Sequence, residues 1–188
     1  MLDALLARPG VLEHCELGAR IGFLALHGGL EAGTAEIAWR AAARSGASVY
    51  AIVQPDGFRW HIPSHRHDPR HSEALAAFLA HVDVVVSVHG YGGLRASDRR
   101  WTTALVGGRD RVLARAIAAA LRRSLPAYRW VDDLDAIPRH LRGVHPGNPV
   151  NGTRAGGVQI ELPPRIRRAP DADTLVEALA SFARGLSR

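Results

Sequence analysis

Residues 82–88 read Val-Asp-Val-Val-Val-Ser-Val, an almost unbroken apolar run. Strands with this character are typically covered on both faces in a mostly parallel sheet. Further short apolar segments also favour strands, namely 20–26, 48–53, 102–106 and 157–162. Segments with a helical pattern lie between or after them, namely 33–45, 69–81, 110–123 and 171–185. This alternation predicts an α/β fold with a mixed, mostly parallel sheet flanked by helices.

Length and composition are those of an ordinary globular protein. With 188 residues, 47% of them hydrophobic and 22% charged, the chain is expected to form a single domain over 1–188. No segment approaches the ~20 apolar residues of a membrane span, and residues 1–20 lack the apolar core of a signal peptide. We therefore expect a cytoplasmic protein, or one released by lysis, without membrane association. The sequence leaves its oligomeric state open.

The charge is biased towards arginine. The chain has 24 basic and 18 acidic side chains, a formal net charge of +6, and contains no lysine. A positive surface favours an anionic substrate, although a solvated basic surface explains the charge equally well. The sequence contains no basic tail and no aromatic stacking platform, which argues against nucleic acid as a partner. Cys15 is the only cysteine, so an intrachain disulfide is excluded.

Chemically versatile side chains follow three of the predicted strands. His27 and Glu31 follow strand 20–26, His89 follows strand 82–88, and Glu161 lies near the end of strand 157–162. In open α/β sheets, ligands bind at the carboxyl ends of the strands. We therefore expect these four side chains to meet.

Two histidines and one acid form a set that catalytic zinc uses, with the fourth position left for water. The Gly-Gly turn after His27 lets Glu31 reach the same ion, and His89 would complete the set. A second carboxylate must then take the proton of the water and pass it to the leaving nitrogen. Glu161 is the candidate, although it shares its strand alternation with Gln159, so a solvent-facing position stays open for it.

Several blocks resemble the phage-type poly-γ-glutamate hydrolase family. They are LHGGLEAGTAEIA (26–38), WHIPS (60–64), VSVHG (86–90), VGGRD (106–110) and GVQIELPPRIR (157–167). The resemblance implies a zinc enzyme with a fold like carboxypeptidase A. By position, it implies His27, Glu31 and His89 as zinc ligands and Glu161 as general base. Members of that family carry one more residue between the HGG turn and the glutamate, which affects the expected geometry of Glu31.

Substrate-binding residues are expected in the loops around this site. Segment 132–156 has little periodicity, and a loop of this length within a compact domain is often functional. It contains Arg154, our first candidate for stabilising the oxyanion or holding a carboxylate, and Asn151, which would assist it. Arg165 is the second candidate. For each arginine, an ordinary surface position explains the sequence equally well.

The block 60–64 supplies His61 and Ser64, which we expect near the substrate, and Tyr91 is a candidate for the pocket wall. A second metal site is an alternative interpretation of four neighbouring histidines, which a solvated polar turn explains as well; they are His61, His65, His67 and His71.

The sequence therefore predicts zinc-dependent hydrolysis of γ-glutamyl or similar acidic amide bonds. The substrate would be a polymer of glutamate or an acidic small molecule. Two alternatives remain: a small-molecule or peptide amidohydrolase or carboxypeptidase of the same fold, and a non-catalytic binding protein that retains the pocket.

Overall fold

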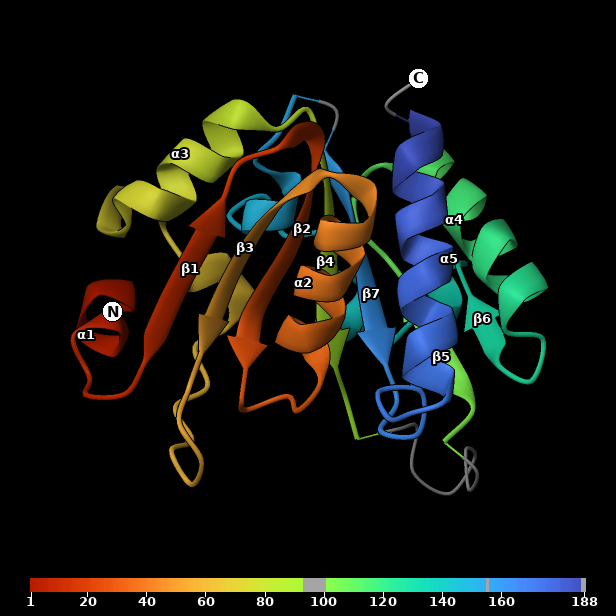
Figure 1. Cartoon of the computed structure of the whole chain (residues 1–188), viewed down its shortest axis with the longest axis horizontal. Coiled ribbons are helices and arrows are strands. Elements are labelled where there is room, and N and C mark those ends of the chain that lie inside the picture. The colour runs from red at the N-terminus through yellow and green to blue at the C-terminus, as the bar shows by residue number, and fades with distance from the viewer. Residues whose placement is uncertain (93–100, 155, 187–188) are drawn as a thin grey trace.

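The computed structural model describes residues 1–92, 101–154 and 156–186. Within these residues one seven-stranded sheet has the order β1-β3-β2-β4-β7-β5-β6 (Figure 1). The strands are β1 (Leu12–Glu16), β2 (Ala19–Gly28), β3 (Ala47–Val53), β4 (Val84–Gly90), β5 (Thr103–Val106), β6 (Arg129–Val131) and β7 (Gly157–Leu162). The helices are α1 (Leu2–Leu6), α2 (Thr34–Ser45), α3 (Glu73–His81), α4 (Arg111–Ser124) and α5 (Asp171–Leu186).

Most neighbouring strands of the sheet are parallel. Strand β2 pairs in parallel with β3 and β4, β4 with β7, and β5 with β6. The antiparallel pairs are β1 with β3 and β5 with β7. The expected mixed, mostly parallel α/β sheet is therefore confirmed.

The two faces of the sheet are covered differently. Helices α2, α4 and α5 pack on one face, which faces the viewer in Figure 1. On the other face, α1 and α3 cover only part of the sheet, and loops complete the cover. Strand β4 contributes to both cores, since Val86 and Val88 point to the first and Val85 to the second. This double burial explains the apolar run with which that strand begins.

Alternation along the central strands places polar side chains on the second face. In β7, Val158 and Ile160 pack with the first core, so Gln159 and Glu161 point to the second face. In β4, His89 lies on the same face, opposite to Val88. The carboxyl ends of the central strands therefore carry their functional groups where the helices leave the sheet uncovered.

The structure differs from the predicted elements mainly at short segments. The helix expected over 69–81 begins at Glu73, because Pro69–His71 form a separate 3₁₀ turn and Ser72 caps the helix by accepting a hydrogen bond from the Leu75 N–H. The sequence did not predict β1, β6 or α1, whose three to five residues are too few for a clear periodicity. None of the described helices has both the length and the apolar character needed to span a bilayer.

Candidate metal centre and active-site pocket

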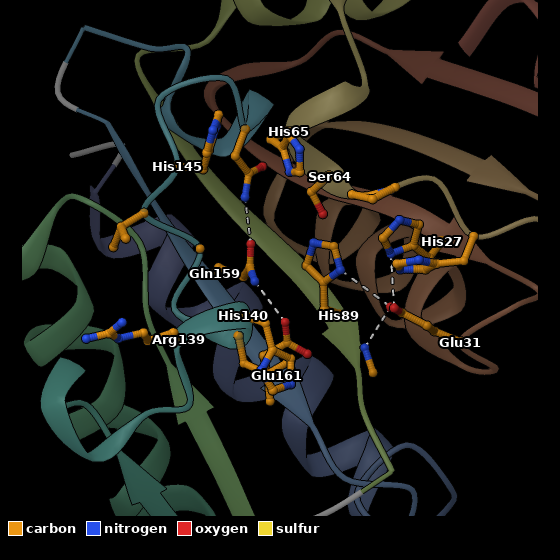
Figure 2. Close-up of a pocket in the computed structure, with 17 residues that line it drawn as sticks. His27, Glu31, Ser64, His65, His89, Arg139, His140, His145, Gln159 and Glu161 are labelled. Carbon is orange, nitrogen blue, oxygen red and sulfur yellow. Dashed lines mark hydrogen bonds and ion pairs between the residues drawn. The ribbon is translucent and has the colours of Figure 1, made fainter. Parts of the chain in front are cut away.

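His27, Glu31 and His89 meet at the carboxyl edge of the sheet. Their potential ligand atoms all lie within 4.8 Å of one another. Nδ1 of His27 is 3.0 Å from Oε1 of Glu31, and Nδ1 of His89 is 3.4 Å from Oε2 of the same carboxylate (Figure 2). The glutamate thus bridges two histidines that come from the neighbouring strands β2 and β4.

A turn with tight backbone packing carries Glu31 to this position. The chain leaves β2 through Gly28 and Gly29, and the N–H of Glu31 donates to the carbonyl of His27. Gly29 has a φ of +78°, and a Cβ there would overlap the carbonyl oxygen of Gln54. Only glycine satisfies both the left-handed backbone and the close approach. Gly28 and Gly29 are therefore required for the turn that brings Glu31 into contact with His27, four residues earlier in the chain.

The contacts around the cluster suit a bound cation. Nε2 of His27 is 2.8 Å from the carbonyl oxygen of Ile62, so Nε2 donates and Nδ1 is left to face Glu31. Burial alone would raise the pKa of Glu31, but the hydrogen bonds with His27 and His89 outweigh it and hold the pKa well below its usual range. Each imidazole presents Nδ1 to one oxygen of the Glu31 carboxylate, and a cation placed between the same atoms would have three ligands. The residues therefore fit a metal ion.

Glu161 lies beside this cluster and is buried. It is paired with His89 in the ladder between β7 and β4, and only 4% of it is exposed. Burial, together with the carboxylate of Glu31, raises the pKa of Glu161 well above its usual range. Nε2 of Gln159 donates to Oε1 of Glu161 over 2.8 Å. The solvent-facing alternative left open by the sequence is therefore wrong, because Gln159 and Glu161 share a face that is covered by loops.

The three residues of the cluster and Glu161 line one pocket of about 640 Å³. This size is typical of small-molecule sites. His61 and Ser64 line the pocket, as expected, and the ring centroids of His61 and His27 are 4.8 Å apart. Its wall comes from loops after β3 and β6 and from the strand ends. The lining residues are His27, Glu31, His61, Pro63, Ser64, His65, His89, Gly90, Arg139, His140, Leu141, Gly143, Val144, His145, Asn148, Gln159 and Glu161.

The structure places neither candidate arginine in the pocket. Arg154 precedes β7 and Glu161 lies near the end of that strand, and strands advance ~3.3 Å per residue, so the two residues lie towards opposite ends of the strand. The guanidinium of Arg165 lies 5.8 Å from the ring centroid of Tyr128 and pairs with Asp171.

Asn151 and Tyr91 also lie outside the pocket lining. Nδ2 of Asn151 donates to the carbonyl oxygens of Gly143 and His145, so it supports the pocket wall from behind. The hydroxyl of Tyr91 donates to the carbonyl oxygen of Thr103.

The four histidines considered for a second metal site do not gather. His67 is fully buried next to His27, with ring centroids 5.5 Å apart. His65 instead stacks on His145, at 4.5 Å between centroids, and His71 is exposed on a separate turn. The one group with metal-site spacing within the described residues remains His27, Glu31 and His89.

Sequence reasoning missed the residues on the opposite wall of the pocket. Asn148, Arg139 and His140 come from the long aperiodic segment that had been expected to be functional, but nothing in its pattern indicates which side chains face inwards. For Gln159, the sequence indicated only that it lies on the same face of its strand as Glu161. The length of the loop was therefore the usable signal for this wall.

An α/β sheet that gathers two histidines and two glutamates at its carboxyl edge is an arrangement typical of metal-dependent hydrolases. A family model described as poly-gamma-glutamate hydrolase matches residues 8–174. The chain therefore belongs to the poly-γ-glutamate hydrolase family, which places it among enzymes that hydrolyse amide bonds. This confirms the resemblance found in the sequence.

Solved structures show the same fold. The bacteriophage poly-gamma-glutamate hydrolase has a TM-score of 0.75 and 22% identity, over 94% of this chain and 89% of that one. The zinc-free apo form of YNDL has a TM-score of 0.78 and 22% identity, over 95% and 92%. The gene product Atu2144 from Agrobacterium tumefaciens has a TM-score of 0.56 and 12% identity, over 95% and 96%. No curated protein gives a significant match.

Proposed function

We propose that this protein is a zinc-dependent hydrolase of γ-glutamyl amide bonds. The observation that carries the proposal is the convergence of His27, Glu31 and His89 beside the buried Glu161, in a chain of the poly-γ-glutamate hydrolase family. A relative of the same fold is described in a zinc-free form, which supports zinc as the metal.

Zinc would be held by Nδ1 of His27, Nδ1 of His89 and the carboxylate of Glu31. Two nitrogen ligands and one oxygen ligand are a common catalytic zinc set. When bound, zinc polarises a carbonyl group and lowers the pKa of a water molecule towards ~7. The bond from His27 Nε2 to the Ile62 carbonyl orients one ligand. The Gly90 N–H, which donates to Oε2 of Glu31 over 2.8 Å, orients another.

Glu161 is our candidate for the general base. It lies one strand away from His89 and lines the pocket. There it would take a proton from the attacking water and deliver it to the nitrogen that leaves when the amide carbon–nitrogen bond breaks. Its raised pKa in the metal-free protein is caused by burial and by the negative charge of Glu31. A cation at the cluster would offset that charge and favour the ionised form that accepts protons.

Substrate carboxylates would be recognised from the pocket wall. Arg139 lines the pocket and is exposed, so its guanidinium can form bidentate contacts with a carboxylate. The overall charge of +6 would attract a polyanion to the same surface. We therefore assign to Arg139 the carboxylate-binding role that the sequence had led us to expect for Arg154 or Arg165.

The test is to incubate the zinc-loaded protein with poly-γ-glutamate and measure the size of the polymer, with α-linked polyglutamate as the matched control. Shortening of the γ-linked polymer alone is expected, together with loss of this activity after removal of zinc by a chelator. An unshortened polymer with a bound stoichiometric metal would reject polymer hydrolysis.

Two alternatives have distinct outcomes in the same experiment. Cleavage of γ-glutamyl dipeptides or acylated amino acids without cleavage of the polymer would indicate a small-molecule amidohydrolase. Binding of glutamate oligomers with neither metal nor cleavage would indicate a non-catalytic protein. We favour the enzyme, because two histidines and one glutamate with metal-ligand spacing match a common catalytic zinc set that leaves one position for water.

A further inference from the structure

A chain of two side-chain amides runs through the protein to Glu161. Nδ2 of Asn148 donates to Oε1 of Gln159, and Nε2 of Gln159 donates to Oε1 of Glu161, each over 2.8 Å (Figure 2). The exposed fractions of the three residues are 3%, 4% and 4%. Burying an amide or a carboxyl group costs free energy unless the group is hydrogen-bonded. The two hydrogen bonds therefore favour one orientation of these three side chains.

The direction of the chain is fixed at its far end. The main-chain N–H of Val150 donates to Oδ1 of Asn148, and a main-chain N–H can only donate. Asn148 must therefore present its NH₂ group to Gln159, which in turn presents its own NH₂ group to Glu161. The group that reaches Glu161 is thus always a donor.

The packing holds the Gln159 amide in place. Gln159 belongs to β7 and pairs with Ser87 of β4 in the middle of the sheet. Gly143 covers it from the other side, with a φ of +67°. A Cβ at Gly143 would lie 2.6 Å from Cβ and 2.8 Å from Oε1 of Gln159. The loop that forms the pocket wall therefore lies directly on the amide that contacts Glu161.

We propose that Asn148 and Gln159 are positioning residues that keep Glu161 oriented as a proton acceptor through this one-way chain of hydrogen bonds. The inference rests on the proposed function of Glu161. The bond from Gln159 occupies Oε1, while Oε2 has no hydrogen bond among the described residues and remains for the pocket that Glu161 lines. A donor at Oε1 fixes the orientation of the carboxylate and leaves Oε2 to accept the proton.

Variants of Asn148 test the direction of the chain. Asn148→Asp retains the shape but has no NH₂ group, so Gln159 must turn its amide and present its oxygen to Glu161. That arrangement is satisfied only when Glu161 carries a proton. Asn148→Ala instead leaves Gln159 free to keep donating. We expect kcat to fall further in Asn148→Asp than in Asn148→Ala, whereas a mere packing role predicts the opposite order, because alanine leaves a cavity.

Gln159→Leu removes the donor without burying a new charge, so it serves if Asn148→Asp does not fold. We expect kcat to fall ~10–100-fold, as for other orienting partners at metal sites. Bound zinc should equal that of the wild type and KM should change little. Unchanged kcat would overturn the proposal, and so would a rise in KM alone, because Gln159 also lines the pocket and would then act as a substrate contact.

Asn151→Asp is the matched control, an identical substitution three residues after Asn148. In the wild type, Nδ2 of Asn151 donates to the carbonyl oxygens of Gly143 and His145 in the pocket wall and makes no hydrogen bond to Gln159. We expect Asn151→Asp to change KM and to spare kcat. A loss of kcat equal to that of Asn148→Asp would mean that general loosening of the loop explains both variants, and would overturn the proposal.

A readout independent of activity separates this inference from the proposed function. In NMR spectra of the metal-free protein, the side-chain NH₂ protons of Gln159 should exchange slowly with solvent and shift strongly in Asn148→Asp. If the wild type cleaves no amide, the proposed function fails and these protons still decide the direction of the chain. Rapid exchange in the wild type, or no shift in the variant, would overturn the chain.

Discussion

Glu161 and His89 are paired residues in the parallel ladder between β7 and β4. A proposed base and a proposed metal ligand are therefore separated by the spacing of adjacent strands, ~4.8 Å between backbones. The sheet itself, and not a loop, sets how the two groups face each other. A site built on regular strands holds its geometry more precisely than one carried on loops.

The first prediction concerns Glu161. Glu161→Gln keeps the bond from Gln159, since an amide oxygen can also accept, but removes the proton acceptor. We expect kcat to fall ~10²–10⁴-fold while bound zinc stays at the wild-type level. Steady-state kinetics and metal analysis on the same preparation provide the measurement. Glu16→Gln, on an exposed residue of β1, is the control that should retain activity.

Glu161→Gln should also stabilise the metal-free protein at neutral pH. A carboxyl whose folded pKa is raised above its unfolded value opposes folding once the pH exceeds the unfolded value, because ionisation is easier in the unfolded chain. The neutral amide removes this cost. Thermal unfolding at pH 7 and pH 4 should show the advantage of the variant at the higher pH only. An equal effect at both values would contradict burial as the cause.

The second prediction concerns the acid between the histidines. Glu31→Gln removes a charged ligand and the partner of both imidazoles, so we expect the zinc affinity to fall by more than the ~10–100-fold typical of outer partners. Competition with a chromophoric chelator measures it. Glu36→Gln, on an exposed residue of α2, provides the comparison. Retention of wild-type affinity in Glu31→Gln would remove Glu31 from the ligand set.

A third prediction separates backbone strain from close packing. Gly29 and Gly57 have nearly equal φ values, +78° and +79°, but a Cβ at Gly57 would meet nothing within 4 Å. Gly57→Ala should therefore cost only the ~1–2 kcal/mol of a left-handed alanine. Gly29→Ala should cost more and should also lose zinc, because the turn that carries Glu31 must shift. Equal free energies of unfolding, from denaturant titrations, would show that the contact with Gln54 is unimportant.

The fourth prediction uses the buried His67. Burial and the nearby His27 lower its pKa to about 3, against ~6.5 when unfolded. Between these pH values His67 is protonated in the unfolded chain but neutral in the folded protein. The free energy of unfolding therefore decreases as the pH falls, by up to ~1.4 kcal/mol per pH unit. In metal-free protein, His67→Leu should therefore gain up to ~2 kcal/mol on wild type between pH 8 and pH 5.

Denaturant unfolding of both proteins across this pH range measures the effect. The control is His71→Leu, at an exposed position four residues away. Relative to wild type, the free energy of unfolding should increase more for His67→Leu than for the control at every pH below ~6.5. Parallel pH profiles for wild type and His67→Leu would show that His67 takes up its proton in the folded state.

The sequence predicted that His27, Glu31 and His89 would converge, because their positions follow from regular structure. Once 20–26 and 82–88 are recognised as parallel strands, His27 and His89 must emerge at the same edge. Strand alternation also placed Gln159 and Glu161 on one face, but the pattern of a single strand does not show that loops would cover that face. Several loop residues that share the pocket with Glu161 lie within 139–148. This segment has no helix or strand periodicity, so the sequence did not show that it would lie against β7.

Predictions for residues in loops were less successful for the same reason. Arg154 and Asn151 are close to Glu161 in sequence, but β7 runs between them and carries Glu161 to its far end. Arg165 follows the strand, yet its side chain lies against Tyr128. No periodicity specifies the path of an irregular segment, so proximity in sequence was a poor guide to proximity in the site.

A crystal structure of the zinc-loaded protein, with anomalous scattering recorded at the zinc edge, would show whether His27, Glu31 and His89 hold the ion. We expect one ion bound by Nδ1 of His27, Nδ1 of His89 and the carboxylate of Glu31, with bonds of ~2.0–2.2 Å, and Glu161 unbound beside it. An ion located elsewhere, or one coordinated by Glu161 in place of Glu31, would contradict it.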